Sequence, residues 1–265
     1  MSRAAEILRD SRKIVLKVGS NVLATEEGTL DRGQAASIAR QALALIGQGK
    51  QVIVVSSGAG VSGAGVIGAQ NRRGDVNYQQ ALCAVGQVEL MMEYKKHFEA
   101  GGRTVGQILL TAEDFEMRVS AMNIRNTFFT LLDEGVVPII NENDSVSYAE
   151  ILDQISDNDS LAAQTANLWN ANLLVLMTDV DGVYDSSPKL HAGAQLIEEV
   201  TNVEELLAQI EIKGKSTWGT GGMESKIRAA AAVGKYGIPM LLVNGRREGV
   251  LADVLEGGRC TLFLP

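Results

Sequence analysis

Short runs of apolar and β-branched residues alternate along this chain with longer segments of helical periodicity. Runs this short are typical of strands that a sheet buries on both faces. Strands are expected at Ile14–Val18, Val52–Val55, Val105–Leu110, Val136–Ile140, Leu173–Met177 and Met240–Val243. Helices are expected at Arg32–Gln48, Tyr78–Ala100, Ala112–Glu134, Asp159–Asn170, Val203–Gln209, Met223–Tyr236 and Gly249–Leu255. The alternation predicts an α/β fold, a three-layer αβα sandwich in which helices cover both faces of a mostly parallel open sheet.

The length of the chain allows one large core. It has 265 residues, of which 46% are apolar, and α/β chains of this length often form one domain. The sequence contains no internal repeat or low-complexity segment, and with 4 prolines it offers no obvious linker. We therefore predict a single domain over residues 1–265.

The charge balance and the cysteine content exclude several classes of protein. Lys and Arg number 24 and Asp and Glu number 32, a net charge of −8, which argues against a nucleic-acid partner. Two cysteines, Cys83 and Cys260, suit a reducing compartment better than a disulfide framework. Residues Met1 to Lys13 mix charged residues with short apolar runs, so we expect no signal peptide there, and no segment approaches the ~20 apolar residues of a membrane span. We expect a cytoplasmic protein without a membrane partner.

The stretch Gly219-Thr220-Gly221-Gly222-Met223-Glu224-Ser225-Lys226 opens an expected helix and is the strongest chemical signal in the chain. A helix start offers unpaired N–H groups to an anion, glycines let the backbone approach it, and a lysine adds charge. A second lysine, Lys17, lies at the end of the first expected strand. Two such lysines indicate phosphoryl transfer.

Polar residues gather at the ends of the other expected strands, where open α/β sheets bind ligands. Ser56-Ser57-Gly58 follows the second strand, the acidic stretch from Asn141 to Asp159 follows the fourth, and Thr178-Asp179 ends the fifth. The acidic stretch is read either as a solvated loop with a helix cap or as a site. In the second reading, Asn141, Asp144 and Asn158 hold a small zwitterion and Asp159 holds the two lysines. Asp181-Gly182 is read as a turn.

Other chemistries match less well. Gly58-Ala59-Gly60-Val61-Ser62-Gly63 has the dinucleotide spacing but lacks the later acidic residue, so a glycine turn or an anion-binding turn is preferred. Gly214-Lys215-Ser216 lacks the first glycine of a P-loop, and Leu161 and Ala162 exclude a calcium loop. With only His97 and His191 present, a nucleophile has no obvious base. Cys83 and Trp169 are read as core residues, and residues 213–222 as a mobile cover.

Six ordered motifs together resemble the amino acid kinase family, and within it the kinases that act on L-glutamate. They are Lys17-Val18-Gly19-Ser20, Ser56-Ser57-Gly58-Ala59, Asn141-Glu142-Asn143-Asp144, Ser156-Asp157-Asn158-Asp159, Thr178-Asp179 and Gly219 to Met223 with Lys226. The resemblance implies transfer of the γ-phosphate of ATP, with Mg²⁺, to the side-chain carboxylate of L-glutamate. The product would be L-glutamyl 5-phosphate, the first intermediate of proline biosynthesis.

The resemblance also implies roles for individual residues. Lys17 and Lys226 would act on the transferring phosphoryl group, with Asp159 organising them. Substrate-binding positions would be Ser57, Gly58, Ala59, Asn141, Asp144 and Asn158. Nucleotide-binding positions would be Lys17, Gly19, Ser20, Thr178, Asp179, Thr220, Gly221, Gly222, Met223, Glu224, Ser225 and Lys226. The protein ligands of the metal stay open.

The chain departs from many relatives at Ser20-Asn21 and at Ser56, and it stops at Pro265, where many relatives continue into a PUA domain. We expect no PUA domain here. The resemblance favours a homodimer or homotetramer and is compatible with feedback inhibition by L-proline. Three alternatives stay open: a family member with another carboxylate or phosphate acceptor, a non-catalytic nucleotide- or amino-acid-binding regulator, and an NAD-dependent oxidoreductase.

Overall fold

The structure is a computed structural model that describes residues 1–68, 75–146, 158–186, 193–213 and 222–265. By its internal contacts the chain divides into two compact units. The terminal unit comprises Met1–Lys17 and Ile155–Pro265, and the central unit comprises Val18–Gln154. A single domain over the whole chain stays a prediction.

The terminal unit contains five strands in the order β1-β5-β7-β8-β6. They are β1 (Lys13–Val18), β5 (Leu173–Thr178), β6 (Glu199–Val200), β7 (Met240–Asn244) and β8 (Thr261–Phe263). β5 pairs with β7 in parallel, and β8 pairs antiparallel with β7. All six residues of β5 are buried, as expected for a strand that helices cover on both faces.

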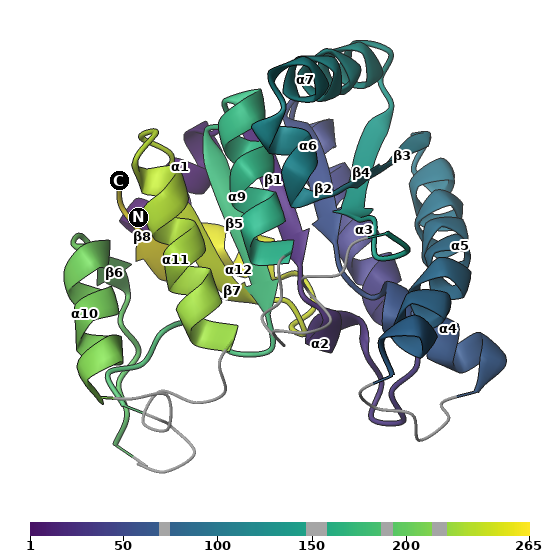
Figure 1. Cartoon of the computed structure of the whole chain (residues 1–265). Helices are drawn as coiled ribbons and strands as arrows, with labels where there is room; N and C mark the ends of the chain where they lie inside the picture. The colour runs from purple at the N-terminus through teal and green to yellow at the C-terminus, as the bar shows by residue number, and fades with distance from the viewer. Residues whose placement is uncertain (69–74, 147–157, 187–192, 214–221) are drawn as a thin grey trace. The chain divides into compact units, whose positions relative to one another are not determined.

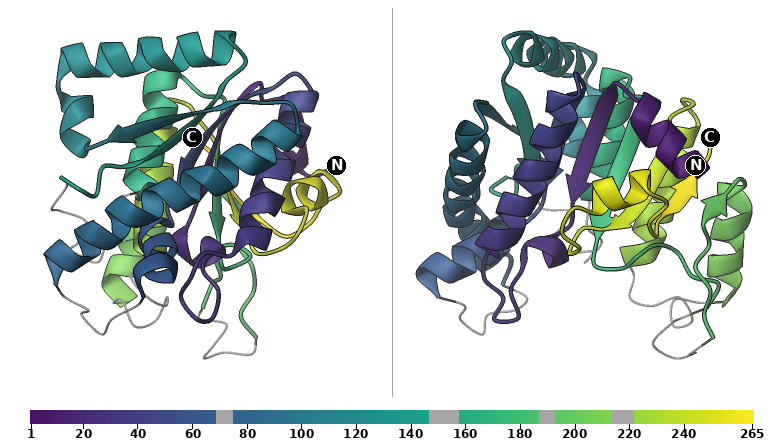
Figure 2. Two further views of the ribbon diagram at one scale, coloured as in Figure 1. Left: turned by 90° about the vertical axis from the view of Figure 1, so that its right-hand side faces the viewer. Right: turned by 180° about the vertical axis from the view of Figure 1, so that it is seen from behind.

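Five helices of the terminal unit cover these strands. They are α1 (Arg3–Asp10), α9 (Asn158–Trp169), α10 (Val203–Lys213), α11 (Gly222–Gly234) and α12 (Val250–Leu255). In Figures 1 and 2, α9 and α11 lie on one face of β5 and β7, and α1 and α12 lie on the other. The indole of Trp169 at the end of α9 is fully buried, which confirms that it is a core residue.

The central unit contains three parallel strands in the order β3-β4-β2. Its elements are α2 (Ser20–Leu23), α3 (Arg32–Gly47), β2 (Gln51–Ser56), α4 (Ala59–Ile67), α5 (Val76–Ala100), β3 (Val105–Leu110), α6 (Ala112–Glu116), α7 (Arg118–Asp133) and β4 (Val137–Glu142). Helices α6 and α7 lie on one face of these strands and α3 on the other (Figure 2). The register pairs Val55 with Ile140, so Ser56, the last residue of β2, lies level with Asn141, the next-to-last residue of β4.

Side-chain caps set where several helices begin. Ser2 accepts a hydrogen bond from the N–H of Ala5 at the start of α1, and Asp31 accepts one from Gln34 at the start of α3. Asp75 caps α5 in the same way. Each such cap satisfies one of the N–H groups that a helix start leaves unpaired, and is worth about 1 kcal/mol.

The expected strands and most of the expected helices are present within about two residues of their predicted bounds. The single helix predicted over Ala112–Glu134 is wrong, because the chain is extended at Met117 and forms two helices there. Helices α1, α2 and α4 were not predicted. Among the described residues, no helix is both long enough and apolar enough to cross a membrane.

Candidate active site

Two lysines that are remote in sequence bind one aspartate in the terminal unit. Lys17, next to last in β1, places Nζ 2.5 Å from Oδ1 of Asp159 in the first turn of α9. Lys226, in the second turn of α11, places Nζ 3.1 Å from the other oxygen, Oδ2. The hydroxyl of Ser225 also donates to Oδ2, at 2.7 Å. The structure therefore brings the three predicted catalytic residues together.

This cluster is buried, so solvent screens its charges only weakly. The side chain of Asp159 is fully buried, that of Lys17 is 2% exposed and that of Lys226 is 13% exposed. Burial by itself raises the pKa of Asp159, but the positive charges of Lys17 and Lys226 outweigh it and hold that pKa below its usual value. Asp159 is thus ionised at neutral pH and holds both ammonium groups.

The glycine-rich stretch is predicted to open a helix, and α11 begins within it at Gly222. Lys226 donates to the carbonyl oxygen of Gly222 at 3.0 Å, which folds its side chain back over the first turn of the helix. Of its three N–H donors, Asp159 and Gly222 take two, and no described residue accepts from the third. Thr220, Gly221 and the predicted cover over residues 214–221 lie outside the described residues.

The remaining predicted positions of the terminal unit lie at or near its strand and helix ends. Thr178 ends β5 and donates to the carboxylate of Asp179 at 3.1 Å. Asn158 begins α9 and is 5% exposed. Glu224 pairs with Arg228 one turn along α11 at 2.8 Å. Met223 lies between Gly222 and Glu224 in the first turn of the same helix.

In the central unit, the turn after β2 leads directly into α4. Gly58 has φ +104°, a left-handed conformation that strongly favours glycine, and α4 begins at Ala59. No described side chain caps this helix start, and a helix start of this kind offers N–H groups to an anion. Ser57, just before the turn, is 2% exposed, and its hydroxyl has no hydrogen-bond partner among the described residues.

Beside this turn, Asn141 is the next-to-last residue of β4, and both ends of its side-chain amide form hydrogen bonds. Its Oδ1 accepts from the backbone N–H of Glu142 at 2.9 Å, and its Nδ2 donates to Oε1 of Gln87 on α5 at 2.8 Å. Asp144 lies in the turn that follows β4 and is half-buried. Gly19 precedes the short helix α2, which begins at Ser20.

The G-x-G-x-x-G spacing has a structural explanation in the central unit. A Cβ atom on Gly63 of α4 would lie 1.9 Å from the carbonyl oxygen of Leu82 on α5. A Cβ atom on Gly86 of α5 would lie 1.8 Å from the carbonyl oxygen of Ala59. These glycines therefore let α4 and α5 pack backbone to backbone. Cys83, between them on α5, is half-buried rather than a full core residue.

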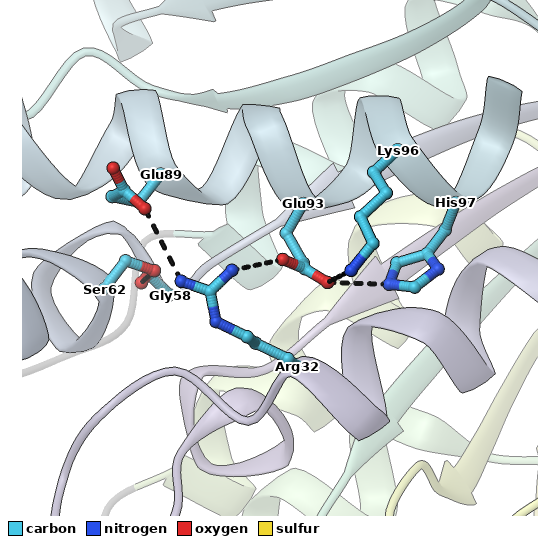
Figure 3. Close-up of polar contacts among 7 residues, drawn as sticks. All are labelled: Arg32, Gly58, Ser62, Glu89, Glu93, Lys96 and His97. Carbon is cyan, nitrogen blue, oxygen red and sulfur yellow. Dashed lines mark hydrogen bonds and ion pairs between the residues drawn. The ribbon is translucent and has the colours of Figure 1, made fainter.

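Helix α5 is also tied to the start of α3 by an ion-pair cluster. Figure 3 shows Arg32, at the start of α3, reaching Glu89 and Glu93 of α5, with Lys96 and His97 also on Glu93. Glu93 is 2% exposed, and Arg32 lies 2.5 Å and His97 2.7 Å from its oxygens. Burial raises the pKa of Glu93, but the hydrogen bonds from His97 and Arg32 outweigh it and lower that pKa. His97 is thus a hydrogen-bond partner of Glu93 within α5.

Two features of the sites were not predicted. Gln87 carries no motif of its own, although its neighbour Gly86 marks the close packing against Ala59. Asp181, predicted as part of a turn, binds Asn244 at 2.9 Å and lies near Arg247 and Arg259. Gly182 packs against Thr261, where a Cβ atom would lie 2.4 Å from the hydroxyl oxygen.

Comparison with known proteins agrees with this geometry. The chain matches the amino acid kinase family over residues 12–244. It is 50% identical to the glutamate 5-kinase of Alkaliphilus metalliredigens over 97% of both chains. It is 43% identical to the glutamate 5-kinase of Geobacter sulfurreducens, over 98% of this chain and 69% of that one.

Solved structures confirm the predicted fold class. A UMP kinase from Bacillus anthracis superposes with a TM-score of 0.66 at 16% identity, covering 96% of each chain. A carbamate kinase from Giardia lamblia gives a TM-score of 0.65 at 15% identity, covering 97% of this chain and 99% of that one. At such low identity these structures establish the fold alone. Together with the closer relatives, they show that the chain belongs to the amino acid kinase family and groups there with the glutamate 5-kinases.

Proposed function

We propose that the chain transfers the γ-phosphate of ATP to the side-chain carboxylate of L-glutamate. The product is L-glutamyl 5-phosphate, and the step is the first of proline biosynthesis. The similarity to two glutamate 5-kinases over nearly the whole of this chain supports the substrate. The observation that carries the proposal is the pair of lysines on one buried carboxylate, Lys17 and Lys226 on Asp159.

The proposed reaction needs charge stabilisation more than proton transfer. The acceptor carboxylate has a reference pKa of about 4.3 and is ionised at neutral pH, so it attacks without a general base. One of its oxygens forms a bond to the γ-phosphorus while the bond to the β,γ-bridging oxygen breaks and ADP leaves. Bringing two anions together is the main barrier, and phosphoryl transfer is mostly positioning and electrostatics.

The lysine pair suits that task. Lys17 and Lys226 come from a strand end and a helix start, and both would contact oxygens of the transferring group. The third N–H of Lys226, which no described residue accepts, is available for a phosphoryl oxygen. Asp159 keeps the ammonium groups in place without contacting the reacting atoms, so its role is positioning. Two full positive charges on one carboxylate leave a net positive site for an anion.

The other roles remain proposals for individual residues. We propose that glutamate contacts Ser57, Gly58, Ala59, Asn141, Asp144 and Asn158. We propose that ATP contacts Lys17, Gly19, Ser20, Thr178, Asp179, Lys226 and residues 220–225. Magnesium would supply charge neutralisation on the ATP phosphates. Among the described residues no group of three or more His, Cys, Asp or Glu is arranged to hold a metal, and Mg²⁺ readily keeps water and phosphate ligands.

We also propose that the chain forms a homodimer or homotetramer in the cytoplasm and that L-proline inhibits it. Exposed apolar side chains support self-association, with Val88 and Met92 one turn apart on α5 and Val119 and Met122 on α7. Neither Cys83 nor Cys260 forms a disulfide, which suits a reducing compartment. Light scattering tests the oligomeric state, and activity assays with added L-proline test the inhibition.

The function is tested by trapping the product. The purified chain, ATP, Mg²⁺ and L-glutamate are incubated with hydroxylamine, and the hydroxamate is measured. Aspartate, N-acetylglutamate and UMP run in parallel as acceptors. We expect turnover with glutamate at least tenfold above each alternative. Turnover only with another acceptor would move the substrate elsewhere in the family, and nucleotide binding in calorimetry without any turnover would establish a non-catalytic binding protein.

A further inference from the structure

Gln87 has a buried side-chain amide that contacts Asn141, one of the predicted glutamate-binding residues. It lies on α5 in the central unit and is 8% exposed. Its Oε1 accepts from Nδ2 of Asn141 at 2.8 Å. Its Nε2 is buried and has no hydrogen-bond partner among the described residues.

The hydrogen bonds of Asn141 fix which end of the Gln87 amide is free. Oδ1 of Asn141 accepts from the backbone N–H of Glu142 at 2.9 Å, so its NH₂ group must face Gln87. Two NH₂ groups cannot hydrogen-bond to each other, so Gln87 presents its oxygen to Asn141. The NH₂ group of Gln87 is therefore the end that points away, with two donors.

A second unpaired polar group belongs to the same region. Gly86, next to Gln87, packs against the backbone of Ala59 and Gly63, which brings this part of α5 against the turn after β2. Ser57 precedes that turn, and its hydroxyl is also buried without a partner among the described residues. Buried polar groups are nearly always hydrogen-bonded in folded proteins, so the open donors of Gln87 and Ser57 point to a bound acceptor.

We propose that the Nε2 group of Gln87 donates a hydrogen bond to the α-carboxylate of the glutamate substrate and sets specificity for it. The inference rests on the proposed function. A carboxylate accepts hydrogen bonds through both oxygens and strengthens them by its charge, so it fits an NH₂ group held by a neutral amide. The γ-carboxylate of glutamate has to meet the phosphoryl group, which leaves the α-carboxylate for Gln87.

The test is Gln87→Glu, which keeps an oxygen for Nδ2 of Asn141 and replaces the NH₂ group by an anionic oxygen. We expect KM for glutamate to rise about 10- to 100-fold, the range of a lost charge-assisted hydrogen bond, with KM for ATP within twofold. We also expect the preference for glutamate over its α-amide, L-isoglutamine, to fall at least tenfold. Gln107→Glu, at an exposed position on β3, adds the same charge and should change neither constant.

The outcomes are distinct. Failure of the wild-type chain to phosphorylate glutamate would overturn the proposed function itself. A wild-type chain that does so, together with a Gln87→Glu variant whose KM and substrate preference are unchanged, would overturn only the role of Gln87. Should Gln87→Glu fail to fold by circular dichroism, Gln87→Met removes the donor without adding charge. It should raise KM for glutamate about tenfold, and an unchanged KM would equally refute the inference.

Discussion

Replacing Asp159 by asparagine removes the charge that holds the two lysines while keeping nearly the same shape. In the wild-type chain Lys17 and Lys226 share this carboxylate at 2.5 Å and 3.1 Å. In the variant, one oxygen and one NH₂ group take the place of the two carboxylate oxygens. The NH₂ group cannot accept a hydrogen bond, so at least one ammonium group loses its partner.

The size of the effect follows from burial. Asp159 is fully buried and the Lys17 side chain is 2% exposed, so solvent cannot replace the lost charge. Removing one partner of a buried ion pair typically costs about 3–5 kcal/mol. A stable protein has about 5–15 kcal/mol in total, so the variant should fold but unfold at a much lower urea concentration. Because a misplacement of about 1 Å can cost 100-fold, we expect kcat to fall about 100-fold or more.

Urea unfolding followed by circular dichroism and the hydroxamate assay measure both effects. Asp253→Asn is the matched control, because the Asp253 side chain is 45% exposed and its ion pair with Arg247 is long, at 4.0 Å. Its free energy of unfolding should change by less than about 0.5 kcal/mol and its kcat should not change. If Asp159→Asn were as stable and as active as the control, Asp159 would not organise the lysines.

Three further predictions use other features of the structure. Lys226→Met should lower kcat about 100- to 1,000-fold in the hydroxamate assay, which is the usual loss for one charge-stabilising donor. Lys235→Met, at an exposed position, should leave kcat unchanged. Equal kcat values for the two variants would contradict the role of Lys226. Because the pKa of Asp159 is lowered in the folded state, its stabilisation is present above the ordinary carboxyl value of 3.8 and is lost as pH falls below it. The stability difference between wild type and Asp159→Asn, measured by urea unfolding, should therefore shrink below about pH 4, and a constant difference would refute that pairing. Gly86→Ala should lower the free energy of unfolding by about 1–3 kcal/mol or more, because the new Cβ atom would lie 1.8 Å from the carbonyl oxygen of Ala59. Gly47→Ala on α3 is the control, because its Cβ atom meets no atom within 4 Å, and it should be neutral or stabilising in thermal unfolding.

The strands could be predicted well because burial on both faces leaves a strong signal. Leu173–Thr178 is apolar to its last residue but one, and every residue is buried. Helix α4 was missed because three of its nine residues, Ala59–Ile67, are glycines, which favour turns in isolation. Gly63 serves close packing against α5, a tertiary contact that local propensity does not contain. The break at Met117 has neither glycine nor proline to mark it.

The candidate site was predictable where residues carry charge at a strand or helix end. Lys17 and Lys226 stood out because one lies at an expected strand end and the other in a glycine-rich helix start, and Asp159 was the carboxylate expected to organise them. Gln87 could not be found this way, because a single glutamine within a long helix carries no pattern. Only the hydrogen bond to Asn141, 54 positions away, reveals it.

A crystal structure of the chain with ADP, Mg²⁺, L-glutamate and a metal-fluoride mimic of the transferring phosphoryl group tests the central claim most directly. The account predicts that Nζ of Lys17 and Nζ of Lys226 each lie about 2.7–3.2 Å from atoms of the mimic, with Asp159 still bound to both. Either nitrogen lying more than about 6 Å from the mimic, beyond any direct hydrogen bond, would contradict it.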